Sequence, residues 1–416
     1  MGNKNKTIWI VNFHTAPPGF AFNPRYIKLV PYLQQAGYDV TIFSSAYLRR
    51  FDKFLTEGNQ RFVESEYDGL KFVHIKSVKY SGNGLMRMIS IFQFTLRLLF
   101  LRNKFQKPDI IYHNLHVPFD SLVYYTAKKL HARYVAEIWD LWPEYFHRMG
   151  LVNKNNPLLK IAFAIEKWMY TKADALVFSM EGGKDYLIEK GWDSISGGKV
   201  ELNKTHYINN GVDLAEFDKN ILEYRLDDQD LENDKFFNVI YLGSIHRANN
   251  LIQVINAANQ LNPELKIKVL IYGDGPERPN LVKYCLDNKI NNVIFKQKHI
   301  PFNQIPYVLS RSSLNIMNYL KDFGDYGVSS GKLFLYLASG KPIISNVAVK
   351  YCVIAKNNIG IAKSIETSEQ YAEAILSIKN MPEQEYLAMC KRVKETAKQF
   401  DFKVLASDLL SILNKQ

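Results

Sequence analysis

A short stretch in the C-terminal half combines small residues and a lysine in a way that suits an anion. Ser329, Ser330 and Gly331 come directly before Lys332, and an apolar helical pattern follows. The first N–H groups of a helix have no partners within it, and they lie at the positive end of the helix dipole. The stretch therefore predicts a phosphate-binding helix start. The alternative is that Ser330 only caps a helix that packs on a sheet.

Candidate acid–base residues lie at the ends of two strand-like segments in the N-terminal half. Asp140 and Glu144 stand on either side of Trp142-Pro143, after the segment 133–139. A carboxylate there can orient or deprotonate a hydroxyl group. The alternative is helix capping by Asp140, with Glu144 offsetting the helix dipole. His113 and His116 lie near the end of another strand, and a structural histidine is the alternative for each.

The elements that must position these residues alternate between short β-branched runs and helical patterns. This alternation predicts parallel sheets covered on both faces. The expected strands cover 7–13, 39–45, 70–76, 109–114, 133–139, 175–180 and 205–210 in the first half, and 238–244, 266–273, 292–297, 314–318 and 341–346 in the second.

The expected fold is α/β, with two doubly wound Rossmann-like domains facing each other across a cleft. An acidic stretch without strand signals at 226–234 separates them. We assign 1–213 to the first domain, 214–400 to the second, and 401–416 to a C-terminal helix that returns to the first. Ligands of such folds bind at the carboxyl ends of the strands.

Composition narrows the function classes. The chain has 416 residues, of which 47% are hydrophobic and 23% charged, and its formal charge is +12. The charge favours an anionic partner. Three cysteines without metal-ligand spacing argue against a zinc site or a disulfide scaffold, and the N-terminus lacks a signal-peptide pattern. We expect a cytoplasmic protein. No basic-aromatic motif of a nucleic-acid module is present, so nucleic acid is not an expected partner.

Several longer segments resemble a known family in their order and spacing. These are INNGVDLAEF (208–217), YLGSIHRANNLIQVINAA (241–258), YGDGPERPNL (272–281) and GVSSGKLFLYLASGKPII (327–344). They are similar to the second domain of retaining family 4 glycosyltransferases of the GT-B fold. AEIWDLWPEYFHRMG (136–150) resembles a segment of the branch that builds bacterial surface polysaccharides. The resemblance implies metal-independent sugar transfer from a nucleotide diphosphate donor, such as a UDP-sugar, with retained configuration and no cofactor.

The resemblance also implies roles for individual residues. Catalytic roles fall to Asp140, Glu144, His116 and Lys332. The implied donor-binding residues are Gly243, Ser244, Arg247, Gly273, Asp274, Ser329, Ser330, Gly331, Lys332 and Leu335. Gly19, Arg25 and His113 are implied on the acceptor side. The family usually has a glutamate at position 335 to bind the donor ribose. Asp322 or Asp325 is the candidate replacement, and an ordinary polar turn in KDFGDYG (321–327) is the alternative for both.

The segment 85–107 is strongly apolar and carries Arg87, Ser90, Gln93, Arg97 and Lys104 along one side of a predicted helix. It is too short to span a bilayer but suits an anionic membrane surface. Packing against the first sheet is the alternative. The resulting hypothesis is a peripheral transferase on the cytoplasmic face that extends a polyprenyl-diphosphate-linked glycan for capsule or O-antigen. A GT-B nucleotide-sugar epimerase and a non-catalytic GT-B binding subunit are the alternatives.

Overall fold

A computed structural model describes residues 6–20, 24–82, 84–115, 118–148, 150, 152–320 and 325–415. The contacts divide the chain into two units. Unit 1 consists of Met1–Asn209 with Leu405–Gln416, and unit 2 consists of Asn210–Val404. The first unit thus ends four residues before the expected position 213, and the C-terminal residues from Leu405 pack in unit 1.

Unit 1 is built on one eight-stranded sheet with the order β10-β9-β8-β7-β1-β2-β6-β5. Neighbouring strands are parallel, except that β5 is antiparallel to β6. Most of the strands are buried apolar runs, as expected of a sheet covered on both faces. Their bounds are β1 Lys6–Val11, β2 Tyr38–Ser45, β5 Phe62–Tyr67, β6 Leu70–Ile75, β7 Ile110–Asn114, β8 Arg133–Ile138, β9 Ala175–Phe178 and β10 Thr205–Tyr207. A separate hairpin joins β3 Tyr47–Leu48 and β4 Lys53–Phe54.

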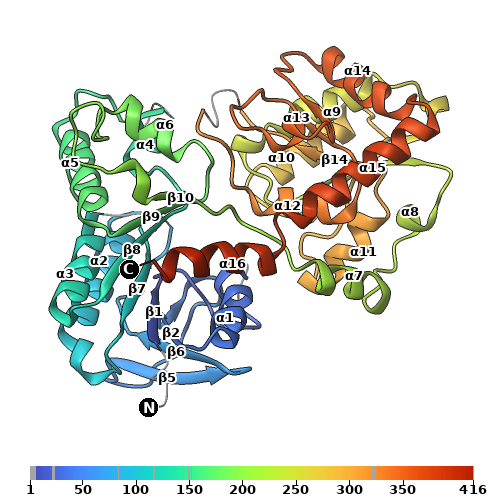
Figure 1. Cartoon of the computed structure of the whole chain (residues 1–416). Coiled ribbons are helices and arrows are strands. Elements are labelled where there is room, and N and C mark those ends of the chain that lie inside the picture. Colours follow the sequence, from blue (N-terminus) through green and yellow to red (C-terminus); the bar gives the residue numbers. More distant parts are fainter. Residues whose placement is uncertain are drawn as a thin grey trace. The chain divides into compact units, whose positions relative to one another are not determined.

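Helices cover both faces of this sheet (Figure 1). One face carries α2 Leu85–Leu101, α3 Ser121–Leu130 and α5 Pro157–Lys172, and the other carries α1 Arg25–Gln35 and α16 Phe402–Leu413. The end of α16 is anchored by Arg133, whose guanidinium donates to the carbonyls of Ile412 and Leu413. Two short helices, α4 Trp142–Arg148 and α6 Gly183–Glu189, follow β8 and β9.

Unit 2 is a six-stranded, fully parallel sheet with the order β13-β12-β11-β14-β15-β16. This is the 3-2-1-4-5-6 order of dinucleotide-binding folds. The strands are β11 Phe237–Leu242, β12 Ile267–Tyr272, β13 Val293–Phe295, β14 Leu314–Met317, β15 Ile343–Ser345 and β16 Gly360–Ala362. The unit also contains α7 Leu214–Glu223, α8 Gln229–Glu232, α9 Leu251–Asn259, α10 Arg278–Asp287, α11 Ile305–Ser310, α12 Gly331–Ser339, α13 Val353–Lys356, α14 Ser368–Lys379 and α15 Glu383–Lys398.

Two apolar clusters hold unit 2 together, one on each face of its sheet. The first joins α9, α10 and α14 to the sheet, and the second joins α11, α12 and α15. Helices therefore cover both faces of the sheet in each unit, as the sequence predicted. The α/β fold with two Rossmann-like domains is confirmed.

Two local features differ from the sequence expectations. The edge strand β5 was missed because its side chains alternate between half-buried and exposed. The sequence signal for this strand is the Asp68-Gly69 pair. Both residues have positive φ, and they form the turn between β5 and β6. The acidic stretch at 226–234, which was expected to separate the domains, lies within unit 2. Asp228 is buried, and Lys296 bridges it to Asp230 at 2.6 and 2.5 Å, which ties α8 to the sheet.

Candidate functional site

The strand order of unit 2 reverses between β11 and β14, and ligands of such sheets bind at this switch point. Two loops follow β11 and β14 there. The first contains Gly243, Ser244 and Arg247, and the second leads into α12 at Gly331. The connection after β12, with Gly273 and Asp274, lies beside the first loop, because the Ile245 amide donates to the Asp274 carbonyl at 2.8 Å. The structure thus brings the predicted donor-binding residues of unit 2 to one edge of its sheet.

Lys332 lies at the centre of this edge. Its amine donates to the Tyr241 hydroxyl at 3.1 Å and to the Asn249 side-chain carbonyl at 3.4 Å, and it lies 4.5 Å from the centre of the Tyr241 ring. No carboxylate of the described residues pairs with it. Burial therefore lowers the pKa of the Lys332 amine from 10.5 to about 8. A half-buried ammonium without a counter-ion favours binding of an anion.

Close backbone packing keeps the loops in place and leaves no room for side chains. A Cβ at Gly273 would lie 1.8 Å from the Gly243 carbonyl oxygen, so this position requires glycine. At Gly243, where φ is +149°, a Cβ would lie 3.4 Å from both Cε and Nζ of Lys332. Glycine at 243 therefore leaves the lysine amine accessible from the loop.

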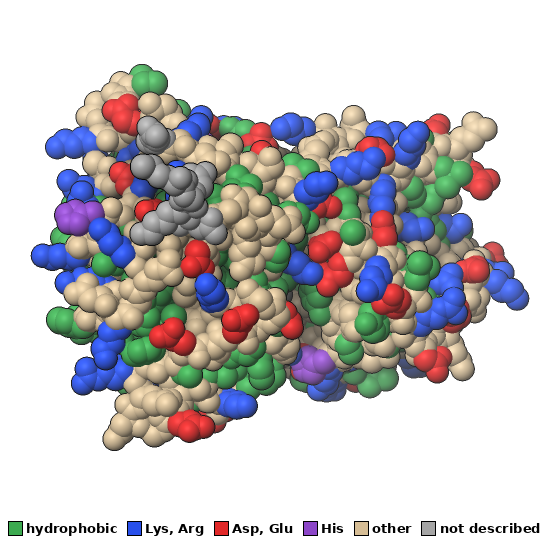
Figure 2. All heavy atoms as spheres, turned by 60° about the horizontal axis from the view of Figure 1, so that its bottom comes forward, with side chains coloured by type: hydrophobic (Ala, Val, Ile, Leu, Met, Phe, Trp, Pro, Cys, Tyr) green, Lys and Arg blue, Asp and Glu red, His purple; other side chains and the backbone are tan. Residues whose placement is uncertain are grey.

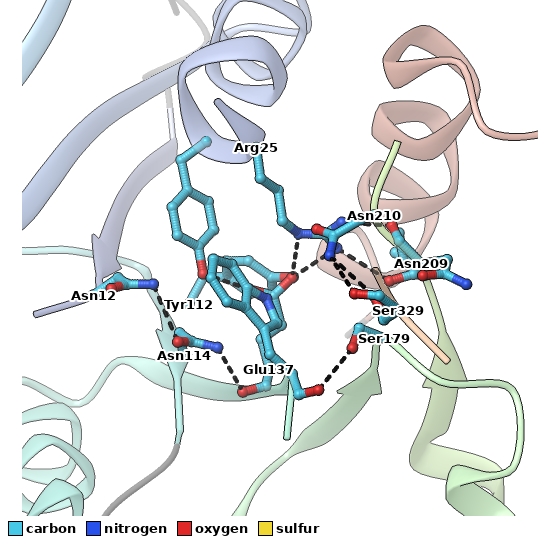
Figure 3. A network of polar contacts seen from close by, with 12 residues as sticks. Asn12, Arg25, Tyr112, Asn114, Glu137, Ser179, Asn209, Asn210 and Ser329 are labelled. Carbon is cyan, nitrogen blue, oxygen red and sulfur yellow. Dashed lines mark hydrogen bonds and ion pairs between the residues drawn. The ribbon is translucent and has the colours of Figure 1, made fainter. Parts of the chain in front are cut away.

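The start of α12 is held by its neighbours rather than by its own cap. Ser330 occupies the N-cap position, but its side chain does not accept a hydrogen bond from the first turn of the helix. Ser329 is fixed by Asn210, whose side-chain amide donates to Ser329 Oγ at 3.0 Å and to its carbonyl at 3.2 Å (Figure 3). Gly331 is exposed, and a Cβ there would meet no atom within 4 Å, so the space beside the helix start is open. The geometry leaves the positive end of the helix available to an anion.

The remaining donor-side residues differ in exposure. Ser244 and Arg247 are exposed, and Arg247 forms no ion pair with any residue that the structure describes. Leu335 is partly buried and packs against the apolar cluster that contains α12. Asp325 is exposed in a turn, whereas Asp322 lies outside the described residues.

In unit 1, Arg25 has a structural environment. Its guanidinium is fully buried and pairs with Glu137 at 2.7 Å, and it also donates to the carbonyls of Ile208 and Asn209 (Figure 3). The hydroxyls of Tyr26 and Tyr112 donate to the same carboxylate. Burial lowers the pKa of the Arg25 guanidinium, but the neighbouring Glu137 raises it, and the net shift is upward, so Arg25 is charged. The expectation that Arg25 faces an acceptor is therefore wrong: its donors are used inside the unit.

Asp140 and Glu144 have different environments. Glu144 is buried and accepts from Arg148 at 2.8 Å and from Lys190 at 2.5 Å. Burial alone would raise the pKa of its carboxyl, but these two cations lower it. Asp140 is exposed and bonds to none of the described residues, although the surrounding protein raises the pKa of its carboxyl by desolvation. Asp140 is therefore available to a ligand, whereas Glu144 is already neutralised.

The remaining predicted residues of unit 1 are His113, Gly19 and His116. His113 is buried, and its Nδ1 lies 2.8 Å from the Tyr134 hydroxyl, so the prediction that it contacts a ligand is wrong and the structural alternative holds. Gly19 lies in an exposed turn at a φ of +82°. His116 lies outside the described residues.

Helix α2 has apolar residues on two sides: Ile91, Phe94 and Leu98 are buried in unit 1, as the packing alternative expected, and a second apolar set faces outward. Ser90 is fully buried, Arg97 donates to the Lys76 carbonyl at 2.5 Å, and Arg87 contacts His14 at 3.0 Å. The outward side instead carries Leu85, Met86, Ile89, Phe92 and Phe100, which are between 40% and 74% exposed. None of the described helices is long and apolar enough to cross a membrane. Arg87, Ser90 and Arg97 of the sequence pattern have partners within unit 1, whereas Lys104 is exposed.

Charge is distributed rather than concentrated on the face shown in Figure 2, where Lys and Arg side chains are spread among acidic ones. Within the described ranges, no group of three or more His, Cys, Asp or Glu side chains could hold a metal ion. The expectation of metal-independent chemistry stays a prediction.

Residues that the sequence did not single out complete both sites. Tyr241 and Asn249 hold the Lys332 amine, and Glu137 neutralises Arg25. Tyr241 had a usable signal, because it stands next to the end of the strand before Gly243. Glu137 had none, since it is separated from Arg25 by 112 positions.

Two family models match the chain. Residues 25–216 match Glycosyltransferase Family 4, and residues 225–400 match Glycosyl transferases group 1. No curated protein matches the sequence.

Solved structures with the same fold cover nearly the whole chain at low identity. One is Anabaena Alr3699/HepE in complex with UDP-glucose, with 14% identity, a TM-score of 0.65, and coverage of 98% of this chain and 99% of that one. Another is from E. coli, a trehalose-6-phosphate structure bound with UDP-2-fluoro glucose, with 12% identity, a TM-score of 0.73 and coverage of 99% of each chain. A third is WaaG, a glycosyltransferase involved in lipopolysaccharide biosynthesis, with 11% identity, a TM-score of 0.67, and coverage of 98% and 100%. These similarities establish the fold.

Proposed function

We propose that this chain, which carries a Glycosyltransferase Family 4 domain and a Glycosyl transferases group 1 domain, transfers a hexosyl or N-acetylhexosaminyl group from a UDP-sugar to a lipid-linked oligosaccharide. The reaction retains the anomeric configuration and needs no metal or cofactor. The product is a precursor of capsule or O-antigen, made at the cytoplasmic face of the membrane. The resemblance of the motifs supports the retaining reaction and the polysaccharide branch. The UDP complexes of the distant structural neighbours support the donor class.

One observation carries the donor side of the proposal. At the switch point of unit 2, the Lys332 ammonium, the uncovered start of α12 and the glycine loop at Gly243 lie together. A departing nucleoside diphosphate gains negative charge as the glycosidic bond breaks. Positive groups that are already oriented stabilise that charge in the transition state. A lysine with a helix start supplies this stabilisation without a metal ion.

Asp140 is the carboxylate of unit 1 that we assign to the acceptor. It lies at the carboxyl end of β8, is exposed, and has no partner among the described side chains. Its raised pKa makes it a stronger hydrogen-bond acceptor for a sugar hydroxyl than an ordinary surface aspartate. Glu144 positions α4 through its ion pairs with Arg148 and Lys190.

The donor test measures the melting temperature with a series of nucleotide sugars, with and without EDTA. A UDP-sugar is expected to raise the melting temperature of the wild-type protein, and EDTA is expected to leave this shift unchanged. Lys332→Met should abolish most of the shift, whereas Lys363→Met, which removes an exposed lysine of the same unit, should preserve it. Absence of any shift would support the alternative of a non-catalytic subunit that binds no donor. Release of an epimerised donor without transfer would support the epimerase.

The membrane test uses the outward face of α2. Leu85 and Phe100 are 74% and 73% exposed, and the exposed Lys104 and Lys107 follow the helix. These apolar and basic groups together suit an anionic interface. Leu85→Ser with Phe100→Ser should release the protein from phosphatidylglycerol vesicles in a sedimentation assay. Leu222→Ser, which alters an 80% exposed leucine of unit 2, is the matched control. Equal sedimentation of all variants would refute the membrane assignment.

A further inference from the structure

Unit 1 contains a pocket that the donor and acceptor assignments above do not use. Its cavity volume is about 340 Å³, within the range of roughly 300–1,000 Å³ that small-molecule sites occupy. The loop after β1, the end of β2, the β3–β4 hairpin region and the first turn of α2 form its wall. The carboxyl ends of β1 and β2 lie side by side because the strands are parallel. The pocket therefore lies on the edge of the sheet where ligands of such folds bind.

The pocket is basic. Arg49, Arg50 and Arg87 line it together with His14, and no Asp or Glu is among its described lining residues. Arg87 reaches His14 at 3.0 Å, and the Arg49 guanidinium lies 6.0 Å from the centre of the Tyr80 ring. Burial lowers the pKa of the Arg87 guanidinium, the nearby Tyr80 raises it, and the positive charge of Arg49 lowers it. A bound anion would offset the positive charge that lines the pocket.

Aromatic side chains form the rest of the wall. Phe20 and Phe51 pack edge to face with ring centres 5.0 Å apart, and the ring of Tyr80 lies 5.7 Å from that of Tyr47. Phe51 is 46% exposed, so this wall is open to a ligand. Guanidiniums next to accessible rings suit a molecule that carries a phosphate group and an apolar or sugar group side by side.

The pocket borders the first turns of α2, which also carry exposed apolar residues. Arg87 belongs to the pocket, and Leu85, Met86 and Ile89 of the same helical turns are exposed. We propose that this pocket binds the diphosphate group of the lipid-linked acceptor, with Arg49 and Arg87 on the phosphates and Phe51 against the adjoining prenyl chain. This inference rests on the proposed function and names the part of the acceptor that unit 1 recognises.

The test titrates inorganic pyrophosphate and geranyl diphosphate by calorimetry. All proteins carry Lys332→Met, so that the phosphate site of unit 2 does not compete. Pyrophosphate binding should weaken at least tenfold in Arg87→Gln and in Arg49→Gln, and it should vanish when both are changed. Arg61→Gln is the matched control, because it removes an exposed arginine of the same unit that does not line the pocket. Unaltered binding in the double variant, or an equal loss in Arg61→Gln, would overturn the proposal.

A second comparison identifies the source of the diphosphate. Geranyl diphosphate should bind at least fivefold more tightly than pyrophosphate, and Phe51→Ala should remove this difference. Equal binding of the two compounds would overturn the lipid assignment. Because Arg49 is exposed and Arg87 is half-buried, the melting temperature without ligand should change little in Arg49→Gln and Arg87→Gln, which separates lost binding from lost folding. Failure of the donor assignment is recognised separately. In that case a UDP-sugar would not raise the melting temperature of protein with Lys332 intact.

Discussion

Replacing Lys332 by methionine should make the protein more stable and a weaker binder of its donor. Methionine keeps the apolar stem of the side chain and removes the charge. In the folded protein, burial lowers the pKa of the Lys332 amine from 10.5 to about 8. At about 1.4 kcal/mol for each pKa unit, this difference corresponds to roughly 3 kcal/mol of unfavourable burial of the charge at neutral pH. Loss of the contacts with Tyr241 and Asn249 offsets part of the gain, so we expect about 1–2 kcal/mol of net stabilisation.

The loss of binding follows from the same charge. A charge-assisted contact with a diphosphate contributes roughly 1.5–3 kcal/mol, which is about 10- to 150-fold in affinity. Calorimetry with UDP at pH 7 measures the affinity, and urea unfolding measures the stability. Lys363→Met, which removes an exposed lysine of unit 2, should change neither quantity.

The pH dependence gives an independent check of the reasoning. Because the folded-state pKa of Lys332 is lowered, the unfolded chain binds more protons between pH 8 and 10.5, and the free energy of unfolding should rise with pH across this window. A bound anion favours the charged amine, so wild-type UDP affinity should fall above pH 8, whereas that of Lys332→Met should not. A destabilised Lys332→Met protein with wild-type UDP affinity would show that the lysine only supports the fold.

Further substitutions separate ligand binding from folding. Asp140→Asn should lower turnover at least about 100-fold while the melting temperature stays constant, because its carboxylate supports no described contact. Glu144→Gln should cost roughly 1–3 kcal/mol of stability, since it weakens two ion pairs, and a selective loss of turnover there would contradict this view. Arg25→Ala should cost about 3–5 kcal/mol by leaving Glu137 buried and unpaired, and urea unfolding measures it. Leu335→Glu should lower the melting temperature without improving UDP affinity, because Leu335 packs in the core; tighter UDP binding would instead place the ribose there.

Much of the architecture could be predicted because it depends on local patterns. The apolar runs predicted the main strands of both sheets, and the small residues before Lys332 predicted the start of α12. The strand order creates the switch point between β11 and β14 and is consistent with those patterns. The order itself depends on how all the strands of the sheet pair with one another.

What each charged side chain does depended on residues far away in the sequence. From the sequence, Arg25 resembles a ligand-binding arginine. In the structure its charge is neutralised by Glu137, which is 112 positions later in the chain and is buried with it. Glu144 resembles a catalytic carboxylate until Lys190 approaches it to 2.5 Å. The same holds for α2, where Ser90 and Arg97 turn inward because Ser77 and the Lys76 carbonyl accept their hydrogen bonds. Periodicity determines that a helix has two sides, but the partners available in the folded chain determine which side is buried, because an unpaired polar group is costly to remove from water.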